Sequence, residues 1–343
     1  MVYTIKEIAK LSGVSVGTVD RVLYNRGRVS AQTREKITSI LENLNFQPNA
    51  MAKSLALRRH PATVGIVSHV QPNFSNYAIE QSELGIKAAI SEIEGSGINF
   101  CHVYSRNFDI NHQITLIDDL VKDGIVALMI QPISSEALLE KISSLEIPVF
   151  CYSNDIPNDY PHYFAGINTY KAGETVAGLF HLINPKLHKM AFISSSLSML
   201  GNLRRSQGFK EKLKQLYGKD IIQCEITAIN DDDIAYKNVY EMLRKNRDID
   251  SLFLNSGAVK ACFAAFTELG ILGKIPIISF DLSETIINNI RNNNIAATIY
   301  QNSYQHSYLT VKRIYNYIVT GILPAQREIY VDFQIIIRQN LND

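Results

Sequence analysis

Polar side chains suited to holding a small hydroxylated molecule recur from residue 153 onward. They fall at the ends of predicted strands or at the start of the following helix: Ser153, Asn154, Arg205, Asn255, Asp281 and Gln301. The carboxyl ends of parallel strands meet at one edge of a sheet, where ligands of open α/β sheets bind. Guanidinium, carboxylate and amide groups suit vicinal hydroxyls, because each hydroxyl both donates and accepts. We therefore expect a sugar-like ligand between these side chains.

Each of these residues also has an ordinary structural interpretation. Asp281 and Asn255 can cap the helices that follow them, and Arg205 can pair with a surface acid. We favour the ligand site because all of the residues fall at matching strand ends. Phe74 and Tyr77, in the loop after the first strand, are candidates for stacking on a sugar face, although core packing is an equal alternative for Tyr77.

An alternation of short apolar runs and amphipathic segments must position this site. A first lobe is predicted from strands at 64–68, 100–104, 127–130 and 149–152, with helices near 76–93, 110–122 and 135–144. The pattern restarts with strands at 190–193, 221–226, 251–254, 276–280 and 297–300. Its helices are expected near 169–183, from after the strand at 190–193 to about 216, and near 232–246, 258–269 and 283–291. A last helix near 304–319 and paired strands near 328–338 are expected to cross between the lobes. The alternation predicts two doubly wound parallel sheets.

The first forty-four residues follow a different, purely helical pattern. Thr4 and Glu7 form a capping box at the start of a helix, which ends at Gly13. Ser15 then caps a second short helix, and two capped helices joined by a glycine-containing turn make a helix-turn-helix. Ser30 caps a third helix whose apolar residues have the spacing needed to cover the first two.

Charge is distributed unevenly along the chain. Residues 1–60 hold ten basic and four acidic side chains, a net charge of +6, whereas the whole chain carries +1 and the remainder therefore −5. Capped helix pairs occur in many proteins, so the motif alone is a weak sign of DNA binding. The basic head shifts the balance towards a domain that meets phosphates.

The head resembles the DNA-binding domain of LacI/GalR-type bacterial transcription regulators. The stretches that carry the resemblance are residues 4–9 (TIKEIA), 13–22 (GVSVGTVDRV), 29–34 (VSAQTR) and 45–55 (NFQPNAMAKSL). The resemblance implies that the second helix lies in the major groove and that Val16, Gly17 and Arg21 read bases, with Arg21 contacting guanine. Gly17 and Asp20 depart from the usual pattern, because one offers no side chain and the other adds a negative charge.

The same resemblance implies contacts to the DNA backbone and minor groove. Phosphate and register contacts are expected from Thr4, Ser15, Thr18, Arg28, Ser30, Thr33 and Arg34, although helix capping is the larger part for Ser15 and Ser30. Residues 48–56 resemble the family's hinge helix, with Asn49 and Ala52 facing DNA and Leu55 wedged between base steps. So short a helix is marginal alone and should order only on DNA and against its partner; a plain linker is the alternative.

The remainder of the chain resembles ribose-type binding proteins and related regulators. Arg205 three residues before Gly208-Phe209, Asn255 and Asp281 at successive strand ends, and Gln301 after a Thr-Ile strand match the family's sugar contacts. Ser153 replaces an acidic residue common in those proteins. The implied fold is an all-α helix-turn-helix head plus an α/β two-lobed periplasmic-binding-protein-like domain of doubly wound parallel sheets. Expected boundaries are 1–47 for the head, 48–60 for the hinge, 61–160 plus 302–323 for the first lobe, and 161–301 plus 324–343 for the second.

Composition excludes several other classes of protein. At 343 residues, 46% hydrophobic and 20% charged, the chain is an ordinary globular one with no long apolar span or signal peptide, so a cytoplasmic location without membrane contact is expected. Its four cysteines are expected to be buried thiols. The sequence contains no GxGxxG, P-loop, nucleophile elbow or HExxH, and its eight histidines lack metal-ligand spacing. We expect no enzyme activity, cofactor or metal.

The combined expectation is a homodimeric regulator, a repressor, that binds operator DNA. Its operator affinity is expected to be controlled allosterically by a monosaccharide or sugar derivative bound between the lobes. A purine or other non-sugar effector is one alternative, and a sugar-binding receptor without a DNA-binding role is another. An enzyme acting on a sugar is a more remote third.

Overall fold

The computed structural model describes residues 3–23, 29–44, 46, 56–70, 76–106, 109–194, 199–227, 231–255 and 257–341. Several predicted contact residues lie outside these ranges. They are the DNA-contacting residues Arg28, Asn49, Ala52 and Leu55 and the aromatic Phe74. The predictions for these residues, and for most of the hinge, therefore stay predictions.

The head is the predicted helix-turn-helix with a third helix packed on it. It consists of α1 (Ile5–Ser12), α2 (Val16–Leu23) and α3 (Ala31–Asn43). The capping box is present, since the Glu7 amide donates to Thr4 Oγ1 at 3.3 Å and the Thr4 amide to Glu7 Oε2 at 2.7 Å. Gly13 ends α1 at φ 69°, a left-handed conformation that glycine adopts without strain. The buried core between the helices is Ile8, Ala9, Val19, Val22 and Ile37.

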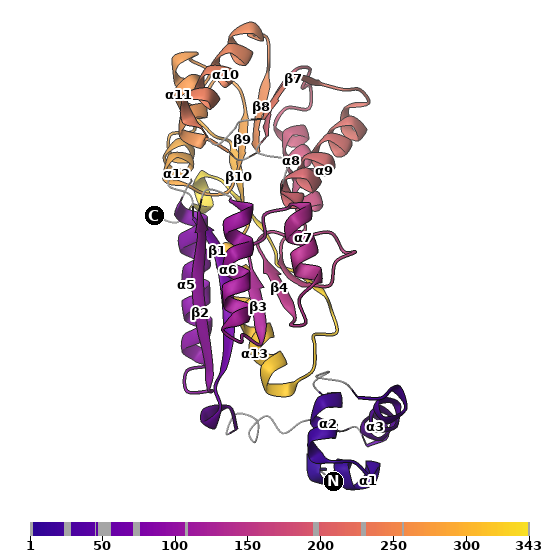
Figure 1. The fold of residues 1–343 in the computed structure, drawn as a ribbon. Coiled ribbons are helices and arrows are strands. Elements are labelled where there is room, and N and C mark those ends of the chain that lie inside the picture. Colours follow the sequence, from indigo (N-terminus) through magenta and orange to yellow (C-terminus); the bar gives the residue numbers. More distant parts are fainter. Residues whose placement is uncertain are drawn as a thin grey trace.

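The first lobe is built on a parallel sheet in the order β11-β5-β4-β3-β1-β2. Figure 1 labels β1, β2, β3 and β4 of this sheet. Its strands are β1 (Ala62–Val70), β2 (Ile98–Arg106), β3 (Ala127–Ile130), β4 (Val149–Tyr152), β5 (Tyr163–Gly166) and β11 (Glu328–Tyr330). Side chains alternate across the sheet, so that Phe150 packs with one pair of helices and Cys151 with the other. The first pair is α5 (Asn76–Glu92) and α13 (Ser303–Thr320); the second is α6 (Ile110–Lys122) and α7 (Glu136–Ser143).

The second lobe repeats this arrangement in the order β12-β10-β9-β8-β6-β7. Its strands are β6 (Met190–Ser194), β7 (Ile222–Thr227), β8 (Ser251–Asn255), β9 (Ile277–Phe280), β10 (Ala297–Tyr300) and β12 (Gln334–Ile336), and only β12 is antiparallel to its neighbour among these described strands. One face is covered by α8 (Thr169–Ile183) and α9 (Leu200–Tyr217). The other is covered by α10 (Asp232–Lys245), α11 (Val259–Glu268) and α12 (Glu284–Arg291), while a short 3-10 turn, η1 (Arg338–Asn340), follows β12.

The predicted boundary between the lobes is wrong at two strands. β5 and β11 were expected in the second lobe, yet they pair with each other at the edge of the first sheet, with Phe164 opposite Glu328. The strands expected to pair near 328–338 therefore lie in different sheets, because β12 pairs with β10. β5 has four residues and follows β4 without an intervening helix, so the strand-helix alternation gives no sign of it.

Helices α8 and α9 approach each other unusually closely. A Cβ atom on Gly173 of α8 would lie 2.1 Å from the carbonyl oxygen of Arg205, and one on Gly208 of α9 would lie 2.2 Å from the carbonyl oxygen of Tyr170. These glycines let the two backbones touch, which fixes the position of α9 on the second sheet. The predicted ligand residue Arg205 lies at this crossing.

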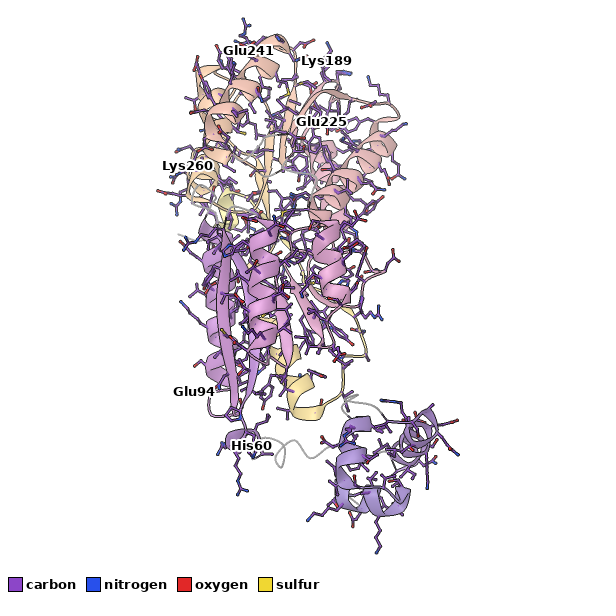
Figure 2. All side chains as sticks on the ribbon, in the orientation of Figure 1. His60, Glu94, Lys189, Glu225, Glu241 and Lys260 are labelled. Atoms are coloured by element: carbon purple, nitrogen blue, oxygen red, sulfur yellow. The ribbon has the colours of Figure 1, made fainter. Side chains whose placement is uncertain are left out.

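Ion pairs on the second lobe lie far from the first lobe. Figure 2 labels Lys189 and Glu241 at its outer end and Glu225 nearer its middle; the three residues pair with Asp248, Arg244 and Lys210, respectively. Their side chains are well exposed to solvent, and exposed pairs of this kind contribute little to stability. They do not bear on the ligand site.

The cysteines only partly follow the prediction of buried thiols. All four are free; Cys151 and Cys262 are buried, whereas Cys101 is exposed and Cys224 half-buried. Both exceptions lie on edge strands: Cys101 of β2 is among the outward-facing side chains, whereas Cys224 of β7 faces inward but is only partly covered by the core of the second lobe. Among the described residues there is no cluster of metal-ligating side chains. Within the same part of the chain, every helix is too short or too polar to span a bilayer.

The close crossing of α8 and α9 predicts opposite effects for two glycines on one helix. Gly173→Ala should lower the free energy of unfolding by about 1–3 kcal/mol, because the added methyl group overlaps the α9 backbone. Gly178→Ala, for which the described atoms leave the space within 4 Å empty, should leave stability unchanged or raise it by up to about 1 kcal/mol. Urea unfolding of both variants measures the difference, and equal stabilities would contradict the close approach.

Candidate effector site and DNA-binding face

Arg205 is the centre of the candidate effector site. Its side chain is 2% exposed and comes from the second turn of α9. Nε donates a hydrogen bond to Asn255 Oδ1, and Nη2 donates to Asn202 Oδ1 at 2.8 Å and to the Asn255 carbonyl oxygen at 3.3 Å. The guanidinium carbon lies 3.6 Å from the centre of the Phe280 ring. A buried cation thus lies over an aromatic face, with its donors directed at amide oxygens.

Asp281 and Gln301 lie at the ends of the neighbouring strands. Gln301 Nε2 donates to Asp281 Oδ1 at 2.6 Å, while the Asp281 amide donates to the Ile299 carbonyl oxygen at 2.8 Å. Asp281 has φ 65°, a conformation uncommon for residues other than glycine that concentrates at functional sites. The sequence prediction that Arg205, Asn255, Asp281 and Gln301 converge is therefore supported by the geometry.

The structural alternatives for these residues are wrong. Ser283, and not Asp281, caps α12, since its Oγ accepts from the Ile286 amide at 3.2 Å. The Asn255 side chain bonds to Arg205 and donates to Ser206 Oγ at 3.1 Å, so it does not cap α11. Arg205 bonds to the side-chain amides of Asn255 and Asn202 in place of a surface acid.

The charges in the site offset each other. Burial lowers the pKa of Arg205 to about 10, and the Asp281 carboxylate opposes this shift. Burial raises the pKa of Asp281, and Arg205 and Gln301 oppose that shift in turn. One cation and one anion leave no net charge for a ligand to neutralise. The site is therefore matched to an uncharged ligand with many hydrogen-bonding groups.

The first lobe supplies neutral polar groups. Ser153 follows β4 with φ 59°, and its Oγ forms a hydrogen bond of 3.2 Å with Nδ1 of His306 on α13. His306 is fully buried, and burial lowers its pKa to about 4. Asn154 is partly buried, its amide donates to the Tyr152 carbonyl oxygen at 2.6 Å, and its Nδ2 finds no partner among the described residues. His306 escaped the sequence prediction because it is 153 positions from Ser153.

Tyr77 takes a packing role. Its ring meets Tyr300 edge-on, with centroids 6.1 Å apart and planes at 68°. It also packs against the apolar core of the second lobe, although it belongs to α5 of the first. The core-packing alternative is supported for Tyr77, which joins the two lobes beside Asp281.

The second helix of the head presents one exposed face. Val16, Gly17 and Arg21 are exposed, whereas Val19 and Val22 of the same helix are buried in the head. The Val16 side chain is 45% exposed, although valine is more often buried in a folded domain. A flat helix face with an apolar residue, no side chain at Gly17 and one guanidinium suits a major groove.

The hydroxyl groups expected at phosphates are tied to helix starts. The Thr18 amide donates to Ser15 Oγ at 3.1 Å, and the Thr33 amide donates to Ser30 Oγ at 3.2 Å. Capping is thus present for both serines, as predicted. Thr4 likewise serves the capping box of α1. A hydroxyl at a helix start, and the amides of the first turn beside it, can still donate to a phosphate oxygen.

Comparison with known proteins identifies both parts of the chain. Residues 4–49 match bacterial regulatory proteins of the lacI family, and residues 67–321 match the periplasmic binding protein domain. The first match covers the head, and the second covers most of both lobes, up to the end of α13. It agrees with the two six-stranded sheets of the described structure.

Individual relatives give the same division. The HTH-type transcriptional regulator DegA of Bacillus subtilis (strain 168) is 29% identical over 216 residues, which are 62% of this chain and 61% of that relative's length. The ribose operon repressor of Halalkalibacterium halodurans is 25% identical over 81% of this chain and 80% of its own. The solved structure of GanP, a glucose-galactose binding protein from Geobacillus stearothermophilus, superposes with a TM-score of 0.71 at 21% identity. The superposition covers 82% of this chain and 99% of GanP, and it shows that the two share a fold.

Burial of neutral His306 predicts a loss of stability in acid. Because its folded pKa of about 4 lies below the ordinary 6.5, the unfolded chain binds the proton first as pH falls. The stabilisation is complete above pH 6.5 and is lost on going down to about pH 4, amounting to about 3 kcal/mol.

The measurement is urea unfolding across that pH range. His306→Asn, which keeps a partner for Ser153, should show a shallower decline than the unsubstituted protein. His188→Asn, at an exposed histidine, is the matched control and should not change the slope. Buried His69, whose pKa burial also lowers to about 4, accounts for acid sensitivity that remains. Parallel curves for His306→Asn and the unsubstituted protein would rule out this role.

Proposed function

The chain belongs to the lacI family of bacterial regulatory proteins, with a periplasmic binding protein domain after its head, and from this premise we propose that it is a sugar-controlled transcriptional repressor. The head binds operator DNA through α2. The two-lobed domain binds an uncharged sugar at Arg205. Ligand binding changes the relation of the lobes and thereby the affinity for DNA.

The buried guanidinium of Arg205 carries the effector part of the proposal. The Arg205 side chain is 2% exposed, and burying its charge is costly. A buried charged group of this kind marks a candidate functional site, here one that binds a ligand. Asn255 and Asn202 occupy some of those donors, and Asp281 supplies the counter-charge. Sugar hydroxyls can bridge such a donor and acceptor pair. The names of a ribose operon repressor and a glucose-galactose binding protein among the relatives agree with this ligand class.

The DNA part rests on the exposed face of α2. One recognition helix reads one half-site, so a homodimer with two heads is required for a palindromic operator. The predicted hinge segments, residues 48–56 of each chain, would connect ligand binding to DNA binding. Their pairing on DNA would depend on the spacing of the two effector domains, and the sugar would alter that spacing. A catalytic role is not part of the proposal.

Substitution of Arg21 tests base reading. Arg21→Ala should weaken binding to the operator by about 1–3 kcal/mol and relax specificity at one base pair. Lys10→Ala, which removes a charge from α1 of the same head, is the matched control and should weaken binding to all duplexes alike with a smaller salt dependence. Fluorescence anisotropy with operator and scrambled duplexes at several salt concentrations separates the two. Equal losses on both duplexes for Arg21→Ala would contradict base reading.

Substitution of Asp281 tests the effector site. Asn tolerates the positive φ of this position, so Asp281→Asn removes the charge without adding backbone strain. Affinity for the sugar should fall by about 1.5–3 kcal/mol, the scale of a hydrogen bond to a charged group, and DNA affinity without ligand should not change.

The measurement is calorimetric titration with D-ribose, D-glucose and D-galactose, each run alongside a sugar phosphate and a purine base. Glu284→Gln, at the neighbouring α12, is the matched control because it removes an exposed charge close by. Tight binding of the phosphate or the purine and none of the sugars would replace the sugar proposal with another effector. Unchanged sugar binding by Asp281→Asn would remove Asp281 from the site.

A further inference from the structure

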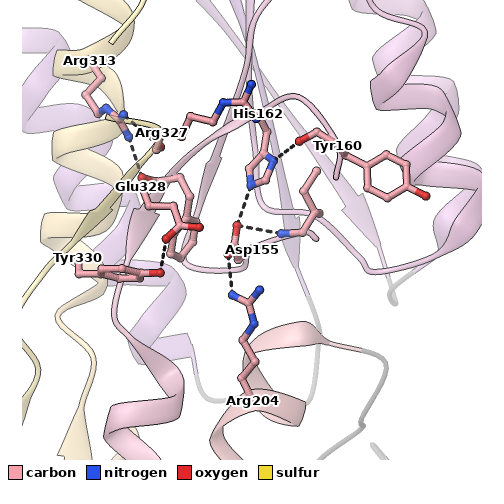
Figure 3. A network of polar contacts seen from close by, with 10 residues as sticks. Asp155, Tyr160, His162, Arg204, Arg313, Arg327, Glu328 and Tyr330 are labelled. Atoms are coloured by element: carbon pink, nitrogen blue, oxygen red, sulfur yellow. Dashed lines mark hydrogen bonds and ion pairs between the residues drawn. The ribbon is translucent and has the colours of Figure 1, made fainter. Parts of the chain in front are cut away.

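Asp155 joins the two lobes by a direct ion pair. It lies in the segment between β4 and β5 of the first lobe and is 5% exposed. Its Oδ2 accepts a hydrogen bond of 3.1 Å from Nη1 of Arg204, which belongs to α9 of the second lobe. Figure 3 shows Arg204 reaching from its helix to the carboxylate. The pair spans the boundary beside the ligand residue Arg205.

The first-lobe side of this pair is held rigidly. Asp155 Oδ1 accepts from the Ile156 amide at 3.0 Å and contacts His162 Nε2 at 2.9 Å. His162 Nδ1 in turn lies 2.8 Å from the Tyr160 carbonyl oxygen. The carboxylate is therefore held by groups of its own lobe as well as by Arg204 (Figure 3).

Arg313 anchors two further segments of the first lobe near Asp155, namely β5 and the segment that leads to β11. Arg313 of α13 donates from Nη1 to the Phe164 carbonyl oxygen at 2.7 Å and from Nη2 to the carbonyl oxygens of Gln326 and, at 3.2 Å, Arg327. These bonds fasten β5 and the segment leading to β11 to the first lobe (Figure 3). The partner that can move is therefore α9.

A second contact joins the first turn of α9 to the first lobe. The Leu200 amide donates to Ser134 Oγ, in the segment after β3, at 3.4 Å. Within the described residues, α9 has no side-chain cap of its own at Met199. A serine from the opposite lobe thus occupies the place of a helix cap, in the same turn that leads to Arg204.

We propose that Asp155, Arg204 and Ser134 form an interlobe latch, and that Arg204 is a positioning residue for the effector response. The latch fastens the start of α9 to the first lobe, and α9 carries Arg205 one residue later. Any movement of the lobes that releases the latch also moves Arg205 relative to Ser153 and His306. Effector affinity and lobe position are therefore linked through one helix. The inference rests on the proposed function only for the identity of the ligand site.

The sharpest test measures the distance between the lobes without ligand or DNA. Spin labels are placed on exposed Cys101 of β2 and on Gln223→Cys of β7, in a Cys224→Ser background that leaves the two buried cysteines unlabelled. Labelled chains are mixed with an excess of unlabelled ones, so that distances within one chain dominate any oligomer. Pulsed electron paramagnetic resonance then gives the distance distribution.

Arg204→Gln should broaden this distribution or add a second population, because the interlobe ion pair is gone. Arg204→Lys should restore much of the original distribution, since it keeps the charge. Lys210→Gln is the matched control on the same helix, where it breaks a pair with Glu225 that stays within the second lobe. Asp155→Asn should act like Arg204→Gln provided that its thermal unfolding remains cooperative. An unchanged distribution in Arg204→Gln would overturn the latch.

A second readout keeps failure of the latch distinct from failure of the proposed function. The protein is titrated with D-ribose, D-glucose and D-galactose. For whichever sugar binds, Arg204→Gln should change the affinity roughly tenfold, within the usual range of coupling between sites. Lys210→Gln should leave the sugar affinity unchanged. If none of the sugars binds the unsubstituted protein, the proposed effector class is wrong, while the distance measurement still decides the latch. If a sugar binds both variants equally, Arg204 does not position the effector site.

Discussion

The structure depends on the accommodation of one buried cation. Arg205 is removed from water, and an unpaired charge in that position would cost several kcal/mol. Its partners come from several elements: Asn202 from α9, Asn255 from β8, Phe280 from β9 and Asp281 just beyond it. The cost is offset only when β8, β9 and α9 are correctly placed together. The site and the core of the second lobe are therefore specified by the same packing.

That packing depends on the close contact of α8 and α9. Because Gly173 and Gly208 have no Cβ atoms, the helices meet backbone to backbone, and this sets how far Arg205 reaches over the sheet. The Phe180, Phe209 and Phe253 rings fill the space below the crossing, with centroids 4.6–6.4 Å apart. A helix placed by its backbone has little freedom to slide. Motion of Arg205 therefore requires α9 to move with its lobe, which makes the effector site sensitive to lobe position.

Local signals in the sequence predicted much of this arrangement. The spacing of Thr4 and Glu7 predicts the first helix of the head, and apolar runs that end in Asn255, Asp281 and Gln301 place those residues at one sheet edge. Such signals span only a few residues, because they arise from local backbone hydrogen bonds and from the burial of apolar side chains. β5 lacked one, since it is a four-residue strand with no helix before it. Its place in the first sheet is set by β4 and β11.

Contacts between side chains that lie far apart in the chain could not be predicted from the sequence. His306 lies 153 positions from Ser153, and Arg204 lies 49 positions from Asp155. Neither pair has a periodic pattern: Ser153 meets His306 through the packing of α13 within the first lobe, and Arg204 meets Asp155 only where the two lobes come together. Asn202, three residues before Arg205, did have a signal: residues three apart share a helix face, which makes it a candidate once α9 is assumed.

Two sets of contacts at the lobe boundary differ in how they resist movement. Arg313 binds backbone carbonyls of the first lobe, whose positions follow from the path of the chain, so it fixes β5 and the segment leading to β11 in any arrangement of the lobes. Asp155 and Arg204 meet through side chains whose exposures are 6% and 34%, and Arg204 can reach water when the lobes separate. A pair of this kind is strong enough to favour one arrangement and weak enough to be released. Backbone anchoring therefore keeps the first lobe in one piece, and the side-chain pair beside the effector site sets the balance between lobe positions.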